Sequence, residues 1–273
     1  IRQFDSELLA EHLEGLTTTL KKRYGGTDTK ALYVSDKNTY GLTGSVRNKE
    51  GNIYNLIYTI QKNQEQAGAG GSWGLGKTSY FRLGNGIVLY YSRIMLSDGT
   101  FEERLAGSLI EDSTKDGRLL DNDRGIAWWG TKDTNSVDDY EASYPLIDHE
   151  QIQQILNIFD IKPYIEGENG TVIIIPFIEE DKLLPKYDDE NKTVRWWESN
   201  LESAIEVAVQ KWYAPRILNP LFEGAYLIPS ISGSILSPDK FQPFFKIFYD
   251  LYIQGLKKKS KGIINVDPIK LSR

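Results

Sequence analysis

Stripes of apolar side chains with helical spacing predict four helices in the first 180 residues. Asp5 or Ser6 is suited to cap the first helix, which we expect to be continuous and to bury Leu8, Leu9, Leu13, Leu16 and Leu20. Similar stripes predict helices at residues 53–60 and 152–159, and residues 80–83 belong to a short helix that begins near residue 78.

Short apolar runs between these helices predict strands, because they are too short to form buried helices. Such runs occupy residues 31–34, 87–91 and 170–175. The dipeptide Asp98-Gly99 is a strong turn signal, so residues 101–110 should return antiparallel to the strand at 87–91.

These elements predict an α+β fold, namely a two-layer α/β sandwich whose mixed, largely antiparallel sheet carries helices on one face. The mostly polar run at 179–191 is typical of a linker or a long loop. Beyond it the pattern changes to helices with one strand at 225–228. We therefore expect one domain at 1–180 and a smaller α/β segment, transducer-like or helical, at 181–273.

Composition narrows the function classes. The chain has no cysteine, which excludes disulfides and thiolate metal sites, and its two histidines are too few for a histidine-built metal centre. A net charge of −6 argues against nonspecific nucleic-acid binding by the whole surface. No stretch approaches the roughly 20 apolar residues of a membrane helix. We expect a cytoplasmic protein without a membrane partner, since absence of cysteine fits a reducing compartment.

A glycine-rich loop at residues 71–78 has the pattern G-x-x-x-x-G-K-[ST]. Glycines let backbone N–H groups approach a phosphate closely, and the start of the following helix adds further donors. Lys77 would supply a full positive charge. The loop therefore predicts phosphate binding, and a merely flexible glycine loop is the alternative.

The same pattern is typical of P-loop NTPases, but its surroundings differ from theirs. A P-loop follows directly on a buried strand, whereas residues 61–66 are polar. The strand at 87–91 is followed by Ser92-Arg93 and not by the acidic residue of a Walker B motif. A P-loop NTPase remains the alternative interpretation.

Three segments, taken in order, carry a family resemblance. Residues 36–44 follow a strand and contain an aspartate with glycines at 41 and 44; residues 71–76 read Gly-x-x-Gly-x-Gly; and Gly170-Thr171 opens a late strand. This order resembles the GHKL superfamily of gyrase, heat-shock chaperone, histidine kinase and MutL. Residues 39–44 and 70–77 resemble those of bacterial MutL- and MORC-like ATPases, which are often linked to restriction or phage defence. The resemblance implies a Bergerat-type ATP-binding fold over residues 1–178.

The resemblance also implies roles for individual residues. Asp36 would accept a hydrogen bond from the adenine amino group, and Thr171 would support Asp36 directly or through water. The alternatives are a turn-capping aspartate and an ordinary strand threonine. The remaining residues implied to contact ATP are Gly41 and Gly44 beside the base, and Gly71, Gly74, Gly76, Lys77 and Thr78 at the phosphates.

One departure concerns the acidic box, in which the family has a glutamate followed four residues later by an asparagine. The first helix offers Glu7, Glu11 and Glu14 but no asparagine. We expect the box to lie upstream in a longer protein, and we assign no catalytic or metal-binding residue. ATP and Mg²⁺ are the expected cofactors of an ATPase module; a scaffold that kept the fold and lost the site is the alternative.

Two further expectations concern motion and partners. The polar, glycine-containing segment 61–72 is predicted to be a lid that is mobile without nucleotide and ordered with it. The resemblance implies an ATP-dependent homodimer. It also suggests DNA or a defence-system protein as a partner, by analogy rather than by residue chemistry.

Overall fold

The computed structural model of the chain describes residues 1–47, 51–58, 78–112, 114, 116–120, 125–134, 143–186 and 193–257. Gly71, Gly74, Gly76, Lys77 and the expected lid lie outside the described residues, and Thr78 is the first described residue after them. The chain divides into two units, Ile1–Glu179 and Glu180–Arg273. Every helix of the described residues is too short or too polar to cross a membrane.

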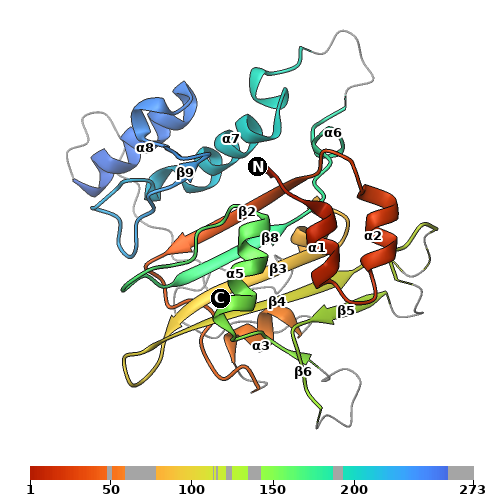
Figure 1. Cartoon of the computed structure of the whole chain (residues 1–273). Coiled ribbons are helices and arrows are strands. Elements are labelled where there is room, and N and C mark those ends of the chain that lie inside the picture. The colour runs from red at the N-terminus through yellow and green to blue at the C-terminus, as the bar shows by residue number, and fades with distance from the viewer. Residues whose placement is uncertain are drawn as a thin grey trace. The chain divides into compact units, whose positions relative to one another are not determined.

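A six-stranded sheet with the order β1-β2-β8-β3-β4-β5 forms the centre of the first unit (Figure 1). Every strand pair in it is antiparallel, so the sheet is not mixed. The predicted hairpin is confirmed, since β3 pairs with β4 across the turn at Asp98-Gly99. The strands are β1 (Arg2–Gln3), β2 (Lys30–Lys37), β3 (Ile87–Met95), β4 (Phe101–Ile110), β5 (Ile126–Trp129) and β8 (Gly170–Ile175), and a separate pair is formed by β6 (Thr131–Lys132) and β7 (Ser143–Tyr144).

Three helices pack on one face of this sheet: α1 (Ser6–His12), α2 (Thr17–Tyr24) and α5 (His149–Ile158). The predicted Asp5 cap is confirmed, because its carboxylate accepts the N–H groups of Glu7 and Leu8 at 2.9 and 3.0 Å. The expectation of one continuous first helix is wrong. The chain leaves the helix after His12 and passes through Gly15 at φ +87°, a left-handed conformation that ends a helix.

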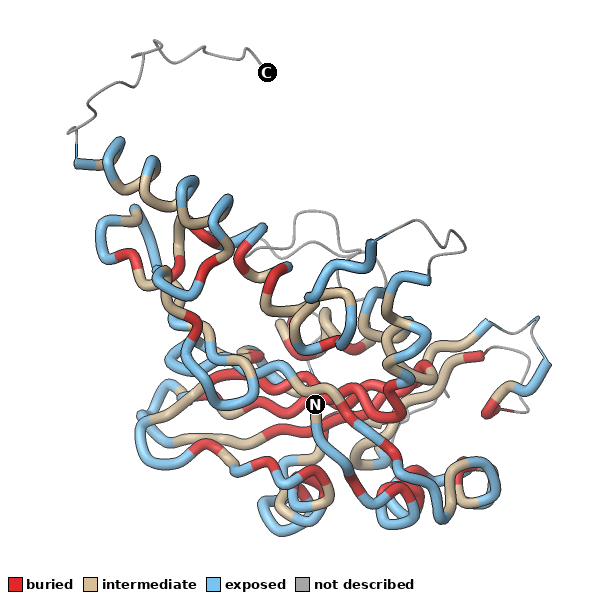
Figure 2. The backbone as a smooth tube through the Cα atoms, turned by 90° about the horizontal axis from the view of Figure 1, so that it is seen from above, coloured by how far each residue is buried: buried red, intermediate tan, exposed pale blue. Residues whose placement is uncertain are grey.

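Two short helices, α3 (Asn52–Ile57) and α4 (Thr78–Leu83), lie against the opposite face, so the prediction of helices on one face is wrong. Trp128, which pairs with Ser108 in the sheet, points to this opposite face. Its indole N–H donates to the carbonyl oxygen of Ile57 in α3 at 3.3 Å. The physical reason is that consecutive residues of β3 and β8 are buried, as the red central strands of Figure 2 indicate. Consecutive residues of a strand point to opposite faces, so both faces need a cover.

The second unit is mainly helical around a small core of Ala214, Ile217, Leu236 and Phe241. The prediction of a strand at 225–228 is wrong, because this segment has a single bridge, between Leu227 and Ile217. Pro229 follows, and its nitrogen cannot donate a hydrogen bond to a strand ladder. The elements are α6 (Glu180–Leu183), η2 (Trp196–Glu198), α7 (Leu201–Tyr213), η3 (Ala214–Arg216), β9 (Ser230–Ile231), β10 (Ser234–Ile235), η4 (Pro238–Lys240) and α8 (Pro243–Leu256).

Candidate functional site

A row of four polar residues crosses the middle of the sheet of the first unit. Asp36 of β2 is paired with Thr171 of β8, Thr171 with Ser92 of β3, and Ser92 with Arg104 of β4. Residues in register across a sheet point to the same face. The core side chains Tyr91 and Val172 point to the face of α1, α2 and α5. The polar row therefore lies on the face of α3 and α4.

The structure brings Asp36 and Thr171 together, although they are 135 residues apart in sequence. The main-chain N–H of Thr171 donates to the Asp36 carboxylate at 3.2 Å, so the contact comes from the backbone. The Thr39 hydroxyl donates to the same carboxylate oxygen at 2.5 Å. Asp36 is exposed, whereas Thr171 is buried. A carboxylate held in this way is an acceptor that a ligand can reach.

The loop that carries Gly41 and Gly44 packs directly onto this row. Gly41 has φ +64°, and a Cβ there would lie 2.7 Å from the Ser92 hydroxyl oxygen, so glycine is required. The N–H of Leu42 donates to the Ser92 hydroxyl at 2.9 Å, and that hydroxyl donates to the Gly170 carbonyl at 2.8 Å. Ser92 thus joins the glycine loop to the strand that contains Thr171.

Arg104 of β4 holds the same loop through hydrogen bonds. The sequence analysis did not identify this residue. Its guanidinium donates to the carbonyl oxygens of Leu42 and Gly44 at 2.9 and 2.5 Å and pairs with Glu102 at 2.7 Å. The side chain is only 3% exposed, so these partners compensate an otherwise costly buried charge. The available signal was a lone arginine at the start of an apolar stretch of the strand.

Replacing Arg104 with lysine should lower the free energy of unfolding by about 2 kcal/mol, because an ammonium cannot reproduce a planar group whose Nη1 donates to both carbonyl oxygens while its Nε pairs with Glu102. Urea denaturation followed by circular dichroism measures this. Arg82→Lys is the matched control, since Arg82 is exposed on α4 and should tolerate the change. Equal stability of the two variants would show that the Arg104 contacts do not stabilise the fold.

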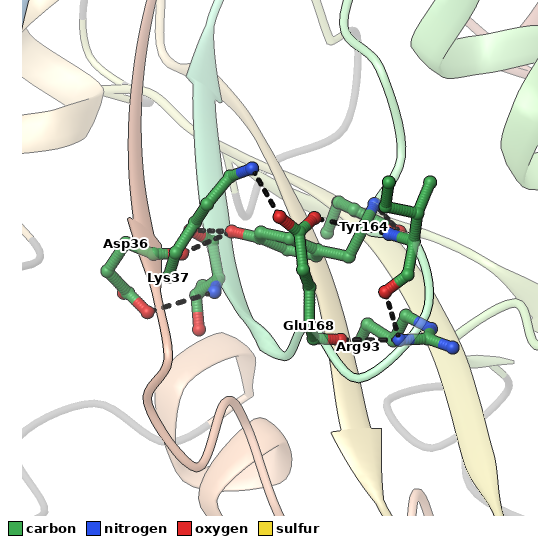
Figure 3. A network of polar contacts seen from close by, with 8 residues as sticks. Asp36, Lys37, Arg93, Tyr164 and Glu168 are labelled. Carbon is green, nitrogen blue, oxygen red and sulfur yellow. Dashed lines mark hydrogen bonds and ion pairs between the residues drawn. The ribbon is translucent and has the colours of Figure 1, made fainter.

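On the other side of Asp36, one ion pair and two hydrogen bonds from Arg93 hold the loop that leads into β8 (Figure 3). Lys37 pairs with Glu168 at 2.9 Å, and the Arg93 guanidinium donates to the carbonyl oxygens of Ile165 and Glu168 at 3.0 and 2.5 Å. The Lys37 ammonium, helped by the Ile165 N–H, lowers the pKa of the Glu168 carboxyl. The ion pair with Lys37 therefore forms where Glu168 is ionised.

Of the loop at 71–78 that is expected to bind phosphates, Thr78 is the one residue that the structure describes. Thr78 is exposed and begins α4. A Cβ on Gly84, just after α4, would lie 3.3 Å from the Ile175 side chain, which shares the face of Asp36 and Thr171. The helix that follows the glycine-rich loop therefore lies on the same face as the polar row.

Within the described residues, no group of three or more histidine, aspartate or glutamate side chains is arranged to hold a metal ion. Glu7 and Glu11 lie on α1, across the sheet from Asp36, and Glu11 instead pairs with Lys21 at 2.9 Å. We therefore derive no metal-assisted step from these residues.

Comparison of the chain with protein-family models, curated proteins and solved structures finds no match. The features that point to a function are the geometry of the polar row, the glycine loop and α4, together with the order of the motifs in the sequence.

Proposed function

We propose that the first unit is an ATP-binding domain of the Bergerat type. Asp36 recognises the adenine base, and the loop at 71–78 holds the phosphates. The observation that carries this proposal is the direct contact between Asp36 and Thr171, beside a glycine loop packed onto the same row. Two motifs that are distant in sequence and linked by the GHKL resemblance thus form one surface.

The chemistry of the row suits adenine. An exposed carboxylate accepts a hydrogen bond from the exocyclic amino group, and guanine would present a carbonyl oxygen at that position. Two acceptors facing each other repel, so a guanine nucleotide should bind more weakly. The alternative of a P-loop NTPase fits poorly, because such enzymes have a parallel sheet and this sheet is antiparallel.

The wider functional proposal follows the family resemblance. Nucleotide binding would order the lid at 61–72 and favour a homodimer, within a larger protein that hydrolyses ATP with Mg²⁺. A role in DNA transactions or anti-phage defence, with DNA or a defence protein as partner, is supported by the resemblance alone.

Isothermal titration calorimetry with a nonhydrolysable ATP analogue tests the binding proposal. We expect one analogue per chain, and binding of the guanine counterpart at least about tenfold weaker. No heat of binding at millimolar analogue would favour the alternative of a scaffold that has lost the site. The same titration on a version extended upstream, with and without Mg²⁺, tests whether a preceding segment completes the metal site.

A further inference from the structure

Tyr164 lies behind the polar row, on the opposite face of the sheet from the Asp36 side chain (Figure 3). It is 6% exposed. The single proton of its hydroxyl is shared between the carbonyl oxygens of Asp36 and Thr171, which lie 2.5 and 3.0 Å from the hydroxyl oxygen respectively. One side chain therefore bridges the two strands at the residue pair that forms the proposed adenine site.

Asp36 lies at a position where the described sheet holds its strand from one side only. β1 pairs with β2 only at Lys30 and Ala31, so at Asp36 the described part of the sheet provides β8 as the sole neighbour of β2. Asp36 is also the next-to-last residue of β2, and its side chain is exposed. The end of an edge strand frays easily, so a second attachment determines how well the carboxylate is placed.

Tyr164 is itself held rigidly enough to provide that attachment. Its ring stacks on Tyr91 with centroids 5.6 Å apart, and its N–H donates to the Tyr91 hydroxyl at 3.3 Å. The Tyr91 hydroxyl in turn donates to Glu103 at 2.5 Å. Burial, with the Asp36 charge nearby, raises the pKa of Tyr164, so its hydroxyl remains a donor at neutral pH.

We infer that Tyr164 is a positioning residue for base recognition, which fixes the Asp36 carboxylate against the amino group of an adenine ligand. The inference rests on the proposed function and deepens it. A recognition group must be held within about 0.5 Å of its productive position to be effective. Tyr164 therefore controls selectivity for the amino group, whereas phosphate affinity is independent of it.

Tyr164→Phe tests this, because it retains the ring and removes only the bridging hydroxyl. Calorimetry compares adenosine with purine riboside, which has the same ring system without the amino group. We expect the wild type to prefer adenosine about tenfold or more, since a hydrogen bond to a charged group is lost with the analogue. In Tyr164→Phe this preference should fall to about threefold or less, with purine riboside affinity nearly unchanged.

Tyr33→Phe is the matched control, since Tyr33 also lies on β2 but its ring packs at Arg2 rather than behind Asp36. It should keep the wild-type preference. A full preference for adenosine in Tyr164→Phe would overturn the inference and leave the proposed function standing. A wild type that binds neither nucleoside would overturn both.

A stability loss alone cannot produce the expected pattern, because it would affect both nucleosides equally. If Tyr164→Phe does not fold, Tyr91→Phe removes the hydroxyl that accepts from the Tyr164 N–H and provides the second test. Its preference for adenosine should also decrease. A Tyr91→Phe variant with the full wild-type preference would overturn the inference in that case.

Discussion

Gly170→Ala is expected to lower the free energy of unfolding of the first unit by at least about 3 kcal/mol. A Cβ at this position would lie 2.1 Å from the Asp36 carbonyl oxygen and 3.0 Å from its carboxylate. The obstacle is the backbone of a paired strand, so no side-chain rotation relieves the clash. In the variant, strands β2 and β8 must therefore separate at the proposed adenine site.

Thermal denaturation followed by circular dichroism measures this effect. A loss of 3 kcal/mol corresponds to a decrease in Tm of roughly 6–12 °C for a unit of the size of residues 1–179. Gly107→Ala is the control in the same sheet, because the nearest atoms to its Cβ would belong to side chains and not to the backbone, namely the flexible end of Leu89 at 3.0 Å and the Trp129 ring at 3.4 Å. Comparable Tm values for the two variants would contradict the close approach of β2 and β8.

The elements that were predictable from sequence are those determined by local patterns. The apolar run at 87–91, the turn at Asp98-Gly99 and the returning strand form a hairpin whose contacts are near in sequence. Asp5 caps α1 because its carboxylate needs only the next turn of backbone. Such features depend on few residues, so a single sequence contains the information that specifies them.

The predictions that are wrong concern features of the fold that tertiary packing determines. The leucines from Leu8 to Leu20 keep helical spacing, and Leu13 and Leu16 are buried, yet both lie in the break between α1 and α2. Apolar spacing reports burial and not the local backbone, so it could not reveal the break. The placement of α3 and α4 on the second face was missed for the same reason.

Most of the candidate site consists of long-range contacts. Arg104 reaches Leu42 across 62 residues, and Tyr164 reaches Asp36 across 128. No local pattern marks Tyr164, and the local signal at Arg104 is only a lone arginine at the start of an apolar stretch. Asp36 and Thr171 were proposed as partners only through the GHKL resemblance, and their contact depends on the strand order, which places β8 between β2 and β3.

Asp36→Asn should weaken binding of adenosine and of ATP by a similar factor, on the order of 10- to 100-fold. The amide keeps the shape of the side chain, and its oxygen can still accept from Thr171 and Thr39, so the fold should remain intact. The charged acceptor for the adenine amino group is lost. Every adenine ligand depends on that acceptor, whatever its phosphate content.

Lys77→Ala should give the opposite pattern, because an ammonium in a phosphate-binding loop contacts only the triphosphate. We expect the affinity for a nonhydrolysable ATP analogue to fall about tenfold or more while adenosine binding is unchanged. Calorimetry with both ligands on both variants separates the two roles. Equal loss of adenosine and ATP binding in Lys77→Ala would remove the lysine from the phosphate site. Unchanged adenosine binding in Asp36→Asn would remove the carboxylate from the adenine site, since no other described group of the row combines negative charge with exposure.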